Sequence, residues 1–313
     1  MDKISIVIPC YRSAEMLDEV VRRIDAALMT HDYEIILVND SSPDNTYEVI
    51  EKLAGEYDNI IGIDLARNFG QHGALMAGLH YATGNIVVCM DDDGQTPPEY
   101  ILALVEAVER PKYDVAYARY QHKKHSLFRN SGSRFNDMMA LALLNKPKDL
   151  YLSSFFAMKR YVADNILQYK NAYAYLPGLV LRATNHICNV DVEHHERENG
   201  RSGYTLKKLV GLWLNGFTAF SVKPLRIADL MGCLVAGAGF LYLLYTLCVY
   251  AVQPTKVAGW NSLMAVLLIL GGSIMLMLGM IGEYLGRTYL SLNNAPQFVV
   301  REIAKADDGS DDK

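Results

Sequence analysis

The chain has 313 residues, a formal net charge of -5 and five cysteines. This length allows a domain with a substantial core and a further segment. The negative charge argues against a general nucleic-acid-binding protein, and the scattered cysteines match no zinc or redox motif. The sequence opens directly on a strand pattern, so we expect no cleavable signal peptide.

Residues 1 to about 120 alternate strand and helix patterns. Strands are predicted at 4–8, 34–38, 60–63 and 85–90, and helices at 14–28, 46–56 and 73–81. Such alternation predicts a mostly parallel, doubly wound sheet that binds ligands at the carboxyl ends of its strands. The residues expected at those ends are Pro9, Tyr11, Asn39, Asp40, Asp91 and Asp93. Neither glycine-rich phosphate motif is present, which argues against dinucleotide dehydrogenases and P-loop nucleotidases.

Three consecutive carboxylates, Asp91, Asp92 and Asp93, follow the apolar strand at 85–90. Adjacent carboxylates repel one another unless a cation or hydrogen-bond donors compensate their charge. Because side chains alternate along an extended segment, we expect Asp91 and Asp93 on one side and Asp92 on the other. With the Gln95 amide, this arrangement suits Mg²⁺ or Mn²⁺ with open positions for phosphate oxygens. A solvated acidic turn is the alternative, but the preceding strand favours a metal site.

The pattern becomes mixed between residues 113 and 194. A strand is predicted at 114–118, a helix at 135–144, and short apolar runs at 153–158 and 187–192. Between them lies a basic stretch that contains Arg119, Arg129 and Arg134 beside lysines and histidines. We interpret the lysines as a solvated face and the arginines as phosphate ligands, because guanidinium binds oxyanions bidentately.

Two uncharged apolar segments, 230–252 and 262–282, are separated by a short loop. As helices, each is long enough to cross the hydrocarbon core of a bilayer, which is about 30 Å thick. Cationic residues precede the first segment and follow the second, whereas the loop carries Lys256 alone. This positive-inside bias predicts that both termini are cytoplasmic. Residues 205–222 form an amphipathic pattern with Trp213, typical of a helix in the membrane interface.

The predicted organisation therefore has four parts. They are a cytoplasmic catalytic domain at 1–204, an interfacial amphipathic helix at 205–228, two transmembrane helices at 229–285 and a cytoplasmic tail at 286–313. Gly282 and Gly286 have the spacing of small residues that pack membrane helices, within one chain or between subunits.

Six segments carry a family resemblance through their order and spacing. They are VIPCY at 7–11, VNDSS at 38–42, RNFG at 67–70, DDDGQTPPE at 91–99, KPLR at 223–226 and GEYLGR at 282–287. With these motifs the chain resembles the family-2 glycosyltransferases of the polyisoprenyl-phosphate type. That group includes dolichyl-phosphate mannose synthase and the bacterial undecaprenyl-phosphate glycosyltransferases. The resemblance covers nearly the whole chain.

The resemblance implies a Rossmann-like α/β fold of the GT-A type in a multi-pass protein of the bacterial inner (cytoplasmic) membrane. It implies a nucleotide-diphosphate sugar donor and a polyprenyl-phosphate acceptor. The implied nucleotide-binding residues are Pro9, Tyr11, Asp40 and Asp92, and the implied metal ligands are Asp91, Asp93 and Gln95. The implied phosphate or acceptor ligands are Arg119, Arg129, Ser133, Arg197, Arg201, Ser202 and Tyr204.

The implied reaction is an inverting displacement. A lipid phosphate oxygen attacks the anomeric carbon, the diphosphate leaves, and the metal stabilises the developing charge, so Asp91 and Asp93 are expected to be catalytic. Many relatives carry an acidic residue where this chain has Ser154. A phosphate monoester has a second pKa of about 6 and is already ionised at neutral pH. We therefore expect activity without a general base, with Ser154 as a catalytic-site residue that orients substrate.

Two alternative functions fit the sequence. A processive polysaccharide synthase shares the sheet and the acidic motif, but adds a QxxRW motif and further membrane spans, which this sequence lacks. A nucleotide-sugar-binding membrane protein without catalysis is the other. The motifs leave the sugar open among glucose, N-acetylglucosamine, mannose and an aminoarabinose derivative, with uridine preferred over guanosine as the base. A homo-oligomer is a further expectation of the resemblance.

Overall fold

The computed structural model describes residues 3–94, 96–121, 147, 149–171, 174–193, 259–292 and 296–306, with single residues between 230 and 251. The chain divides into two compact units. The first is Met1–Tyr204 together with Asn294–Lys313, and the second is Thr205–Asn293. The helices expected at 135–144 and 205–228 lie outside the described residues.

The first part of the sheet follows the predicted alternation of strands and helices. Its strands are β1 (Ile4–Cys10), β2 (Tyr33–Asn39), β3 (Ile60–Leu65) and β4 (Ile86–Cys89). The helices between them are α1 (Leu17–Leu28), α2 (Thr46–Glu56) and α3 (Gln71–Tyr81). β1 pairs in parallel with β2 and β4, and β2 pairs in parallel with β3. The expected mostly parallel arrangement is confirmed.

The remaining strands extend the sheet on both sides. The elements are a short 3-10 helix η1 (Pro98–Tyr100), α4 (Ile101–Glu109), β5 (Val115–Gln121), β6 (Phe156–Lys159), α6 (Arg160–Leu167), α7 (Leu176–Ala183), β7 (Ile187–Glu193) and β8 (Val300–Ala304). Among the described residues the strand order is β7-β5-β6-β4-β1-β2-β3-β8. β6 runs antiparallel to β4 and β5. The beginning of β6 therefore lies beside the end of β4, where the acidic residues follow.

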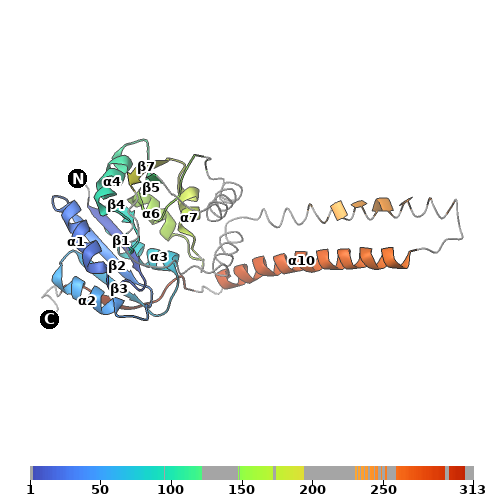
Figure 1. The fold of residues 1–313 in the computed structure, drawn as a ribbon, viewed down its shortest axis with the longest axis horizontal. Helices are drawn as coiled ribbons and strands as arrows, with labels where there is room; N and C mark the ends of the chain where they lie inside the picture. Colours follow the sequence, from blue (N-terminus) through green and yellow to red (C-terminus); the bar gives the residue numbers. More distant parts are fainter. Residues whose placement is uncertain are drawn as a thin grey trace. The chain divides into compact units, whose positions relative to one another are not determined.

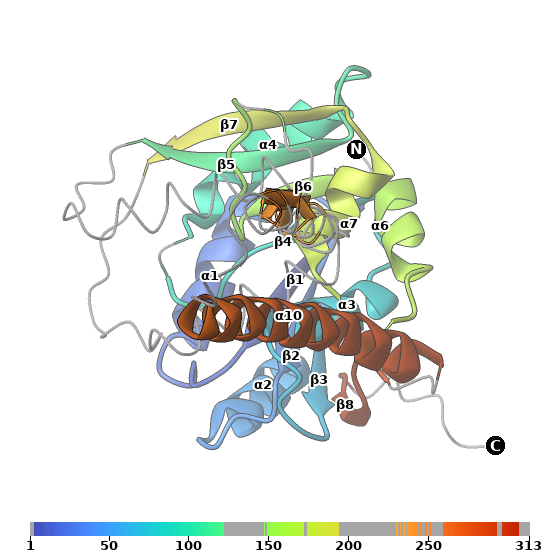
Figure 2. The same cartoon turned by 90° about the vertical axis from the view of Figure 1, so that its right-hand side faces the viewer.

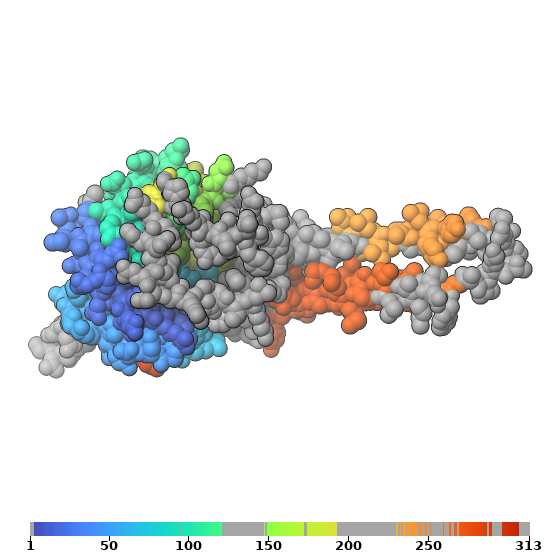
Figure 3. Space-filling view, viewed as in Figure 1, coloured from blue at the N-terminus to red at the C-terminus, as the bar shows by residue number. Residues whose placement is uncertain are grey.

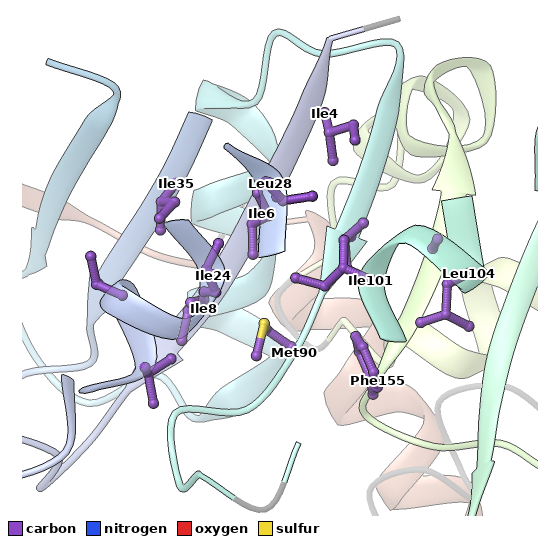
Figure 4. Packing of buried hydrophobic residues seen from close by; sticks show 14 of the residues in the cluster. Ile4, Ile6, Ile8, Ile24, Leu28, Ile35, Met90, Ile101, Leu104 and Phe155 are labelled. Atoms are coloured by element: carbon purple, nitrogen blue, oxygen red, sulfur yellow. The ribbon is translucent and has the colours of Figure 1, made fainter. Parts of the chain in front are cut away.

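The hydrophobic core fills both faces of the sheet, with α1, α2 and α4 on one face and α3, α6 and α7 on the other (Figure 1). Figure 4 shows Ile4, Ile6 and Ile8 of β1 among side chains of α1 and α4. Every residue of β1 is buried, because neighbouring strands and both helical layers enclose it. This explains why β1 is an almost unbroken apolar run rather than an alternating one.

Helix α3 packs closely against β1 and β2, and Gly78 permits this packing. A Cβ atom built on Gly78 lies 2.3 Å from Cγ1 of Val7 and 3.1 Å from Cγ2 of Val38. Both neighbours are β-branched side chains on strands, which have little freedom to move aside. The helix is thereby held at the distance that places its first residue, Gln71, beside the acidic loop.

The segment expected as a cytoplasmic tail, 286–313, contains the end of a helix and a strand. Helix α10 (Trp260–Leu292) continues past the expected boundary, and Val300–Ala304 forms β8, which pairs antiparallel with β3 (Figure 2). A five-residue strand with three exposed residues gives a weak sequence pattern, so its role became visible only through its pairing partner. The acidic end, residues 307–313, lies outside the described residues.

The second unit contains α10, in which Ile269–Gly286 is long and apolar enough to cross a membrane. Large apolar side chains of this helix are exposed, including Leu276 and Ile281, and Figure 3 shows its surface in orange-red. Among the described residues, α10 alone meets this criterion. The described residues between 230 and 251 are helical, and the rest of the first expected span lies outside the described residues.

We expect Gly78→Ala to destabilise the protein, because the added methyl group overpacks the contact between α3 and β1. Overpacking of this kind costs about 1–3 kcal/mol. The melting temperature of the detergent-solubilised chain should fall by several degrees. The matched control is Gly55→Ala in α2, where no atom lies within 4 Å of the added Cβ. That change should stabilise the helix by about 0.4–1 kcal/mol. Equal melting temperatures for both variants would contradict the packing argument.

Candidate active site

Three loops meet at the carboxyl edge of the sheet. They follow β1, β2 and β4 and contain Tyr11, Asp40 and Asp91. The parallel register holds the strand ends together, with Cys10 paired to Asn39 and Val7 paired to Cys89. In open parallel sheets this edge is where ligands bind. The polar residues that follow these strands are therefore close in space, as the sequence predicts.

Asp92 joins the loop after β4 to the loop after β1. Its Oδ2 atom accepts hydrogen bonds from the backbone N–H of Tyr11, at 3.1 Å, and from the hydroxyl of Ser13. Burial raises the pKa of Asp92, and these two donors oppose the shift. Asp92 therefore holds Tyr11 in place through its backbone.

Asp40 joins the loop after β2 to the loop before α3. It is 4% exposed, and its two oxygens accept hydrogen bonds from the backbone N–H groups of Phe69, at 2.7 Å, and Gly70, at 2.8 Å. The side-chain amide of Asn68 donates to the Asp40 carbonyl oxygen at 3.1 Å. Burial raises the pKa of Asp40 although these donors favour the ionised form. Any hydrogen bond to a nucleotide has to use the remaining lone pairs of this carboxylate.

Asp91 lies between two side-chain donors. Its Oδ1 atom accepts a hydrogen bond from Nε2 of Gln71 at 2.7 Å, and its Oδ2 atom accepts one from the hydroxyl of Ser154. Burial raises the pKa of Asp91 to about 6, and the negative charges of Asp93 and Asp92 add to this shift, whereas both donors oppose it. The antiparallel course of β6 brings Ser154 to this position. Two donors therefore orient this carboxylate, while its surroundings still disfavour the ionised form.

Asp91 and Asp93 are the two carboxylates that the sequence predicts as metal ligands at this edge. Within the described ranges, no three His, Cys, Asp or Glu side chains lie close enough to form a metal site by themselves. Gln95, the third expected ligand, lies outside the described residues. Mg²⁺ is commonly bound by one or two carboxylates, with water and substrate phosphates as the other ligands. The chemistry of this edge fits such an open site.

Comparison with known protein families assigns the part of the chain that forms this edge to one family. The family model described as glycosyl transferase family 2 matches residues 5–167, which include all of the elements that form the acidic edge. The chain belongs to glycosyltransferase family 2. A second model, described as the GtrB C-terminal hairpin, matches residues 223–288 of this glycosyltransferase. The family resemblance stated from the motifs is thus confirmed.

Curated relatives match this glycosyltransferase over nearly its whole length. The undecaprenyl-phosphate 4-deoxy-4-formamido-L-arabinose transferase of Yersinia enterocolitica is 34% identical over 310 residues, which are 97% of this chain and 94% of the relative. The enzyme of the same description from Yersinia pestis has the same identity and coverage. Both relatives are polyprenyl-phosphate glycosyltransferases, the group identified from the motifs.

Solved structures confirm the fold. Glucosyl-3-phosphoglycerate synthase from Mycobacterium tuberculosis, crystallised with Mn²⁺, UDP and glucosyl-3-phosphoglycerate, superposes with a TM-score of 0.52 at 17% identity. The superposition covers 67% of this glycosyltransferase and 75% of the synthase. At this identity the likeness concerns the α/β fold of the catalytic domain alone.

Two of the expected nucleotide-binding residues, Tyr11 and Pro9, differ in their exposure to solvent. Tyr11 is 46% exposed, so its ring is available to a ligand. Pro9 is buried within β1, where it pairs with Val38. Arg12, the residue after Tyr11, has a positive φ of 60°. Such a conformation is uncommon for a residue other than glycine and is typical of loops held by their surroundings.

Of the expected phosphate ligands, Arg119 is described and is engaged in an ion pair. Its Nε atom lies 2.5 Å from Oδ1 of Asp191, the residue opposite it in the pairing of β5 with β7. Asp191 also raises the pKa of Arg119. The pair is exposed, and exposed ion pairs of this kind contribute little to stability. The other expected ligands lie outside the described residues: Arg129, Ser133, Arg197, Arg201, Ser202 and Tyr204.

Sequence reasoning missed Gln71 and Ser13. Gln71 begins α3 directly after the RNFG motif, and Ser13 follows the VIPCY motif by two positions. Their nearness to these motifs was the available signal. It did not identify their partners, because Gln71 contacts Asp91 and Ser13 contacts Asp92 across gaps of 20 and 79 positions.

We expect the metal-free protein to be destabilised by ionisation of Asp91. Because the pKa of Asp91 is higher in the folded chain than in the unfolded chain, its contribution to stability is lost as the pH rises through about 6. Asp91→Asn, which stays neutral, should melt a few degrees higher than the wild type at pH 7.5 in EDTA. This advantage should disappear at about pH 4, near the ordinary pKa of aspartate. A difference that does not change with pH would rule out this electrostatic explanation.

We expect Gln71 and Ser154 to orient Asp91 jointly. Gln71→Leu and Ser154→Ala each leave one donor, so each variant should keep measurable sugar transfer, with kcat lowered about tenfold or less. The double variant should lose more than the product of the two single effects, because both donors act on one carboxylate. Steady-state kinetics of the three variants test this coupling. Strictly multiplicative effects would show that the two residues act independently.

Proposed function

We propose that this glycosyltransferase moves one sugar from a nucleotide-diphosphate sugar, with UDP as the nucleotide, to a polyprenyl phosphate, with undecaprenyl phosphate as the acceptor. The observation that carries the proposal is the acidic edge itself, where Asp91 is oriented by two donors beside Asp93. The names of the relatives from Yersinia support the acceptor. The structural neighbour crystallised with UDP supports the nucleotide.

The donor is proposed to bind at the loops after β1 and β2. Tyr11 presents an exposed aromatic ring there, and Asp92 and Asp40 hold the neighbouring backbone segments in place. An aromatic ring beside fixed polar backbone groups suits a nucleoside, which stacks on one face and forms hydrogen bonds at its edge. The diphosphate then extends toward the loop after β4.

Asp91, Asp93 and Gln95 are proposed to hold Mg²⁺ or Mn²⁺ at the diphosphate. The pKa of Asp91, raised by burial and by the charges of its neighbours, indicates a deficit of positive charge at this point. A divalent cation compensates that deficit and, when bound, stabilises the charge that develops on the leaving diphosphate. Gln71 and Ser154 keep the Asp91 oxygens directed into the site. Crystals of the structural neighbour with Mn²⁺ support a divalent ion.

The acceptor phosphate is proposed to meet Arg129, Ser133, Arg197, Arg201, Ser202 and Tyr204, with Arg119 released from Asp191. A phosphate oxygen attacks the anomeric carbon in line and the diphosphate leaves, which inverts the anomeric centre. The phosphate monoester is ionised at neutral pH, with a second pKa of about 6, and needs no general base. Ser154, which contacts Asp91, orients that carboxylate rather than removing a proton from the acceptor.

The membrane segment is proposed to be a two-helix hairpin with both termini in the cytoplasm of a bacterium. The match of residues 223–288 to a hairpin model and the exposed apolar surface of α10 support this topology. A lipid acceptor lies at the bilayer surface, so an attached catalytic domain meets it without a search in three dimensions. The Gly282 and Gly286 pair offers a packing face for the two helices or for a homo-oligomer.

We expect Asp93→Asn to abolish sugar transfer while the protein stays in the membrane fraction, because the change removes a charged metal ligand and leaves the apolar segments intact. The measurement is transfer of labelled sugar into a chloroform-extractable lipid, with Mn²⁺ or Mg²⁺ present. The matched control is Asp58→Asn, an exposed residue before β3 at the opposite edge of the sheet. A fully active Asp93→Asn enzyme would refute the metal assignment.

The same assay distinguishes the proposed function from its alternative. A product that stays lipid-linked and carries one sugar supports the lipid-phosphate enzyme, whereas a long water-soluble polymer supports a processive synthase. A panel of UDP- and GDP-linked sugars with undecaprenyl phosphate then identifies the donor. Because of the relatives, UDP-linked 4-deoxy-4-formamido-L-arabinose is the first sugar to test.

A further inference from the structure

A buried carboxylate links the C-terminal strand to the donor edge of the sheet. Asp64, near the end of β3, is 1% exposed, and its Oδ1 atom accepts a hydrogen bond from Nδ2 of Asn39 at 2.6 Å. Its Oδ2 atom forms an ion pair with Nε of Arg301 in β8, at a distance of 2.6 Å. Within the described part of the chain, this oxygen accepts no hydrogen bond. Removing the partner of a buried charge is costly, so the contact with Arg301 is expected to matter for the position of the Asp64 side chain.

The contacts continue from Asp64 to the loops after β1 and β2. Asn39, which is 3% exposed, accepts a hydrogen bond from the backbone N–H of Ser42 at 3.2 Å. The Ser42 hydroxyl oxygen in turn accepts one from the backbone N–H of Arg12 at 2.8 Å. Ser41 and Arg12 both have positive φ values, 51° and 60°. These two strained residues flank the proposed nucleotide site and depend on neighbouring contacts for their conformation.

The residues before β8 brace the other side of the same edge. The carbonyl oxygen of Val299 accepts a hydrogen bond from the backbone N–H of Ala66 at 2.9 Å. The Gln297 carbonyl oxygen approaches within 3.2 Å of the position that a Cβ on Gly73 would take. Residues 66–73, between these two contacts, include the backbone N–H group of Phe69, which binds Asp40. They also include Gln71, which binds Asp91. Figure 2 shows β8 beside β3 at this end of the sheet.

We propose that Arg301 is a positioning residue for the donor site, acting through Asp64 and Asn39 on the loops that bind the nucleotide. The chain that returns from the membrane segment therefore completes the donor edge and sets its affinity for the nucleotide. This inference rests on the proposed donor site after β1 and β2. Arg301 touches no substrate in this role, so its effect falls on nucleotide affinity rather than on the lipid acceptor.

The test uses the full-length protein in detergent, with UDP and Mn²⁺ as the probe and isothermal calorimetry as the measurement. Loss of the ion-pair partner of the buried Asp64 carboxylate should weaken UDP binding about tenfold in Arg301→Met. Arg301→Lys retains the charge and should restore part of the affinity. Lys305→Met removes a positive charge from an exposed residue just after β8 and should bind UDP like the wild type.

Kinetics separate positioning from general damage to the fold. In Arg301→Met the KM for the sugar donor should rise about tenfold, while the KM for the polyprenyl phosphate stays within about twofold of the wild type. Asp64→Asn combined with Arg301→Met should cost no more than the larger single effect, because both act on one path. If Arg301→Met does not fold, Arg301→Lys and Asp64→Asn carry the same comparison of the two KM values.

Unchanged UDP affinity in Arg301→Met, or an equal rise in both KM values, overturns this inference. Either result leaves the proposed function intact, since the wild type still binds UDP and transfers sugar. A wild-type protein that binds neither UDP nor GDP in the presence of metal contradicts the proposed donor site itself. The two failures are therefore distinguishable in one set of measurements.

Discussion

The need to compensate buried negative charge organises the carboxyl edge of this sheet. Asp40, Asp64, Asp91 and Asp92 lie there within a short distance of the strand ends, and each has an oxygen that accepts hydrogen bonds from another segment of the chain. Ionised carboxylates away from water need such partners, so each one fixes a neighbouring loop. Hydrogen bonds to these four carboxylates therefore position the loops of the site.

This compensation leaves one carboxylate, Asp91, in surroundings that disfavour its ionised form. The compensation at Asp91 is incomplete, since burial and its acidic neighbours still raise its pKa to about 6. A divalent cation bound at the proposed site would relieve the repulsion that disfavours the ionised form of Asp91. The acidic triplet also separates into distinct roles. Asp92 holds the loop that carries Tyr11, and Asp91 faces α3 and β6.

Strand direction determines which distant residues reach the site. β6 runs antiparallel to β4, so its beginning lies next to the end of β4 and Ser154 meets Asp91. β8 likewise runs antiparallel to β3, which brings Arg301 to Asp64. In both cases a segment far away in sequence supplies a group to the carboxyl edge. Chain reversal, rather than local sequence, creates these contacts.

The sequence by itself determined the α/β alternation, the parallel strands, the position of the acidic edge and the apolar C-terminal segment. These depend on local periodicity and on strand ends, which are written into consecutive residues. Only the tertiary structure decided that Ser154 and Gln71 share Asp91, that Asp191 engages Arg119, and that the expected tail contributes β8. Such pairings depend on strand order, direction and register, none of which is fixed by consecutive residues. A change of register by one residue moves a side chain to the other face of a sheet.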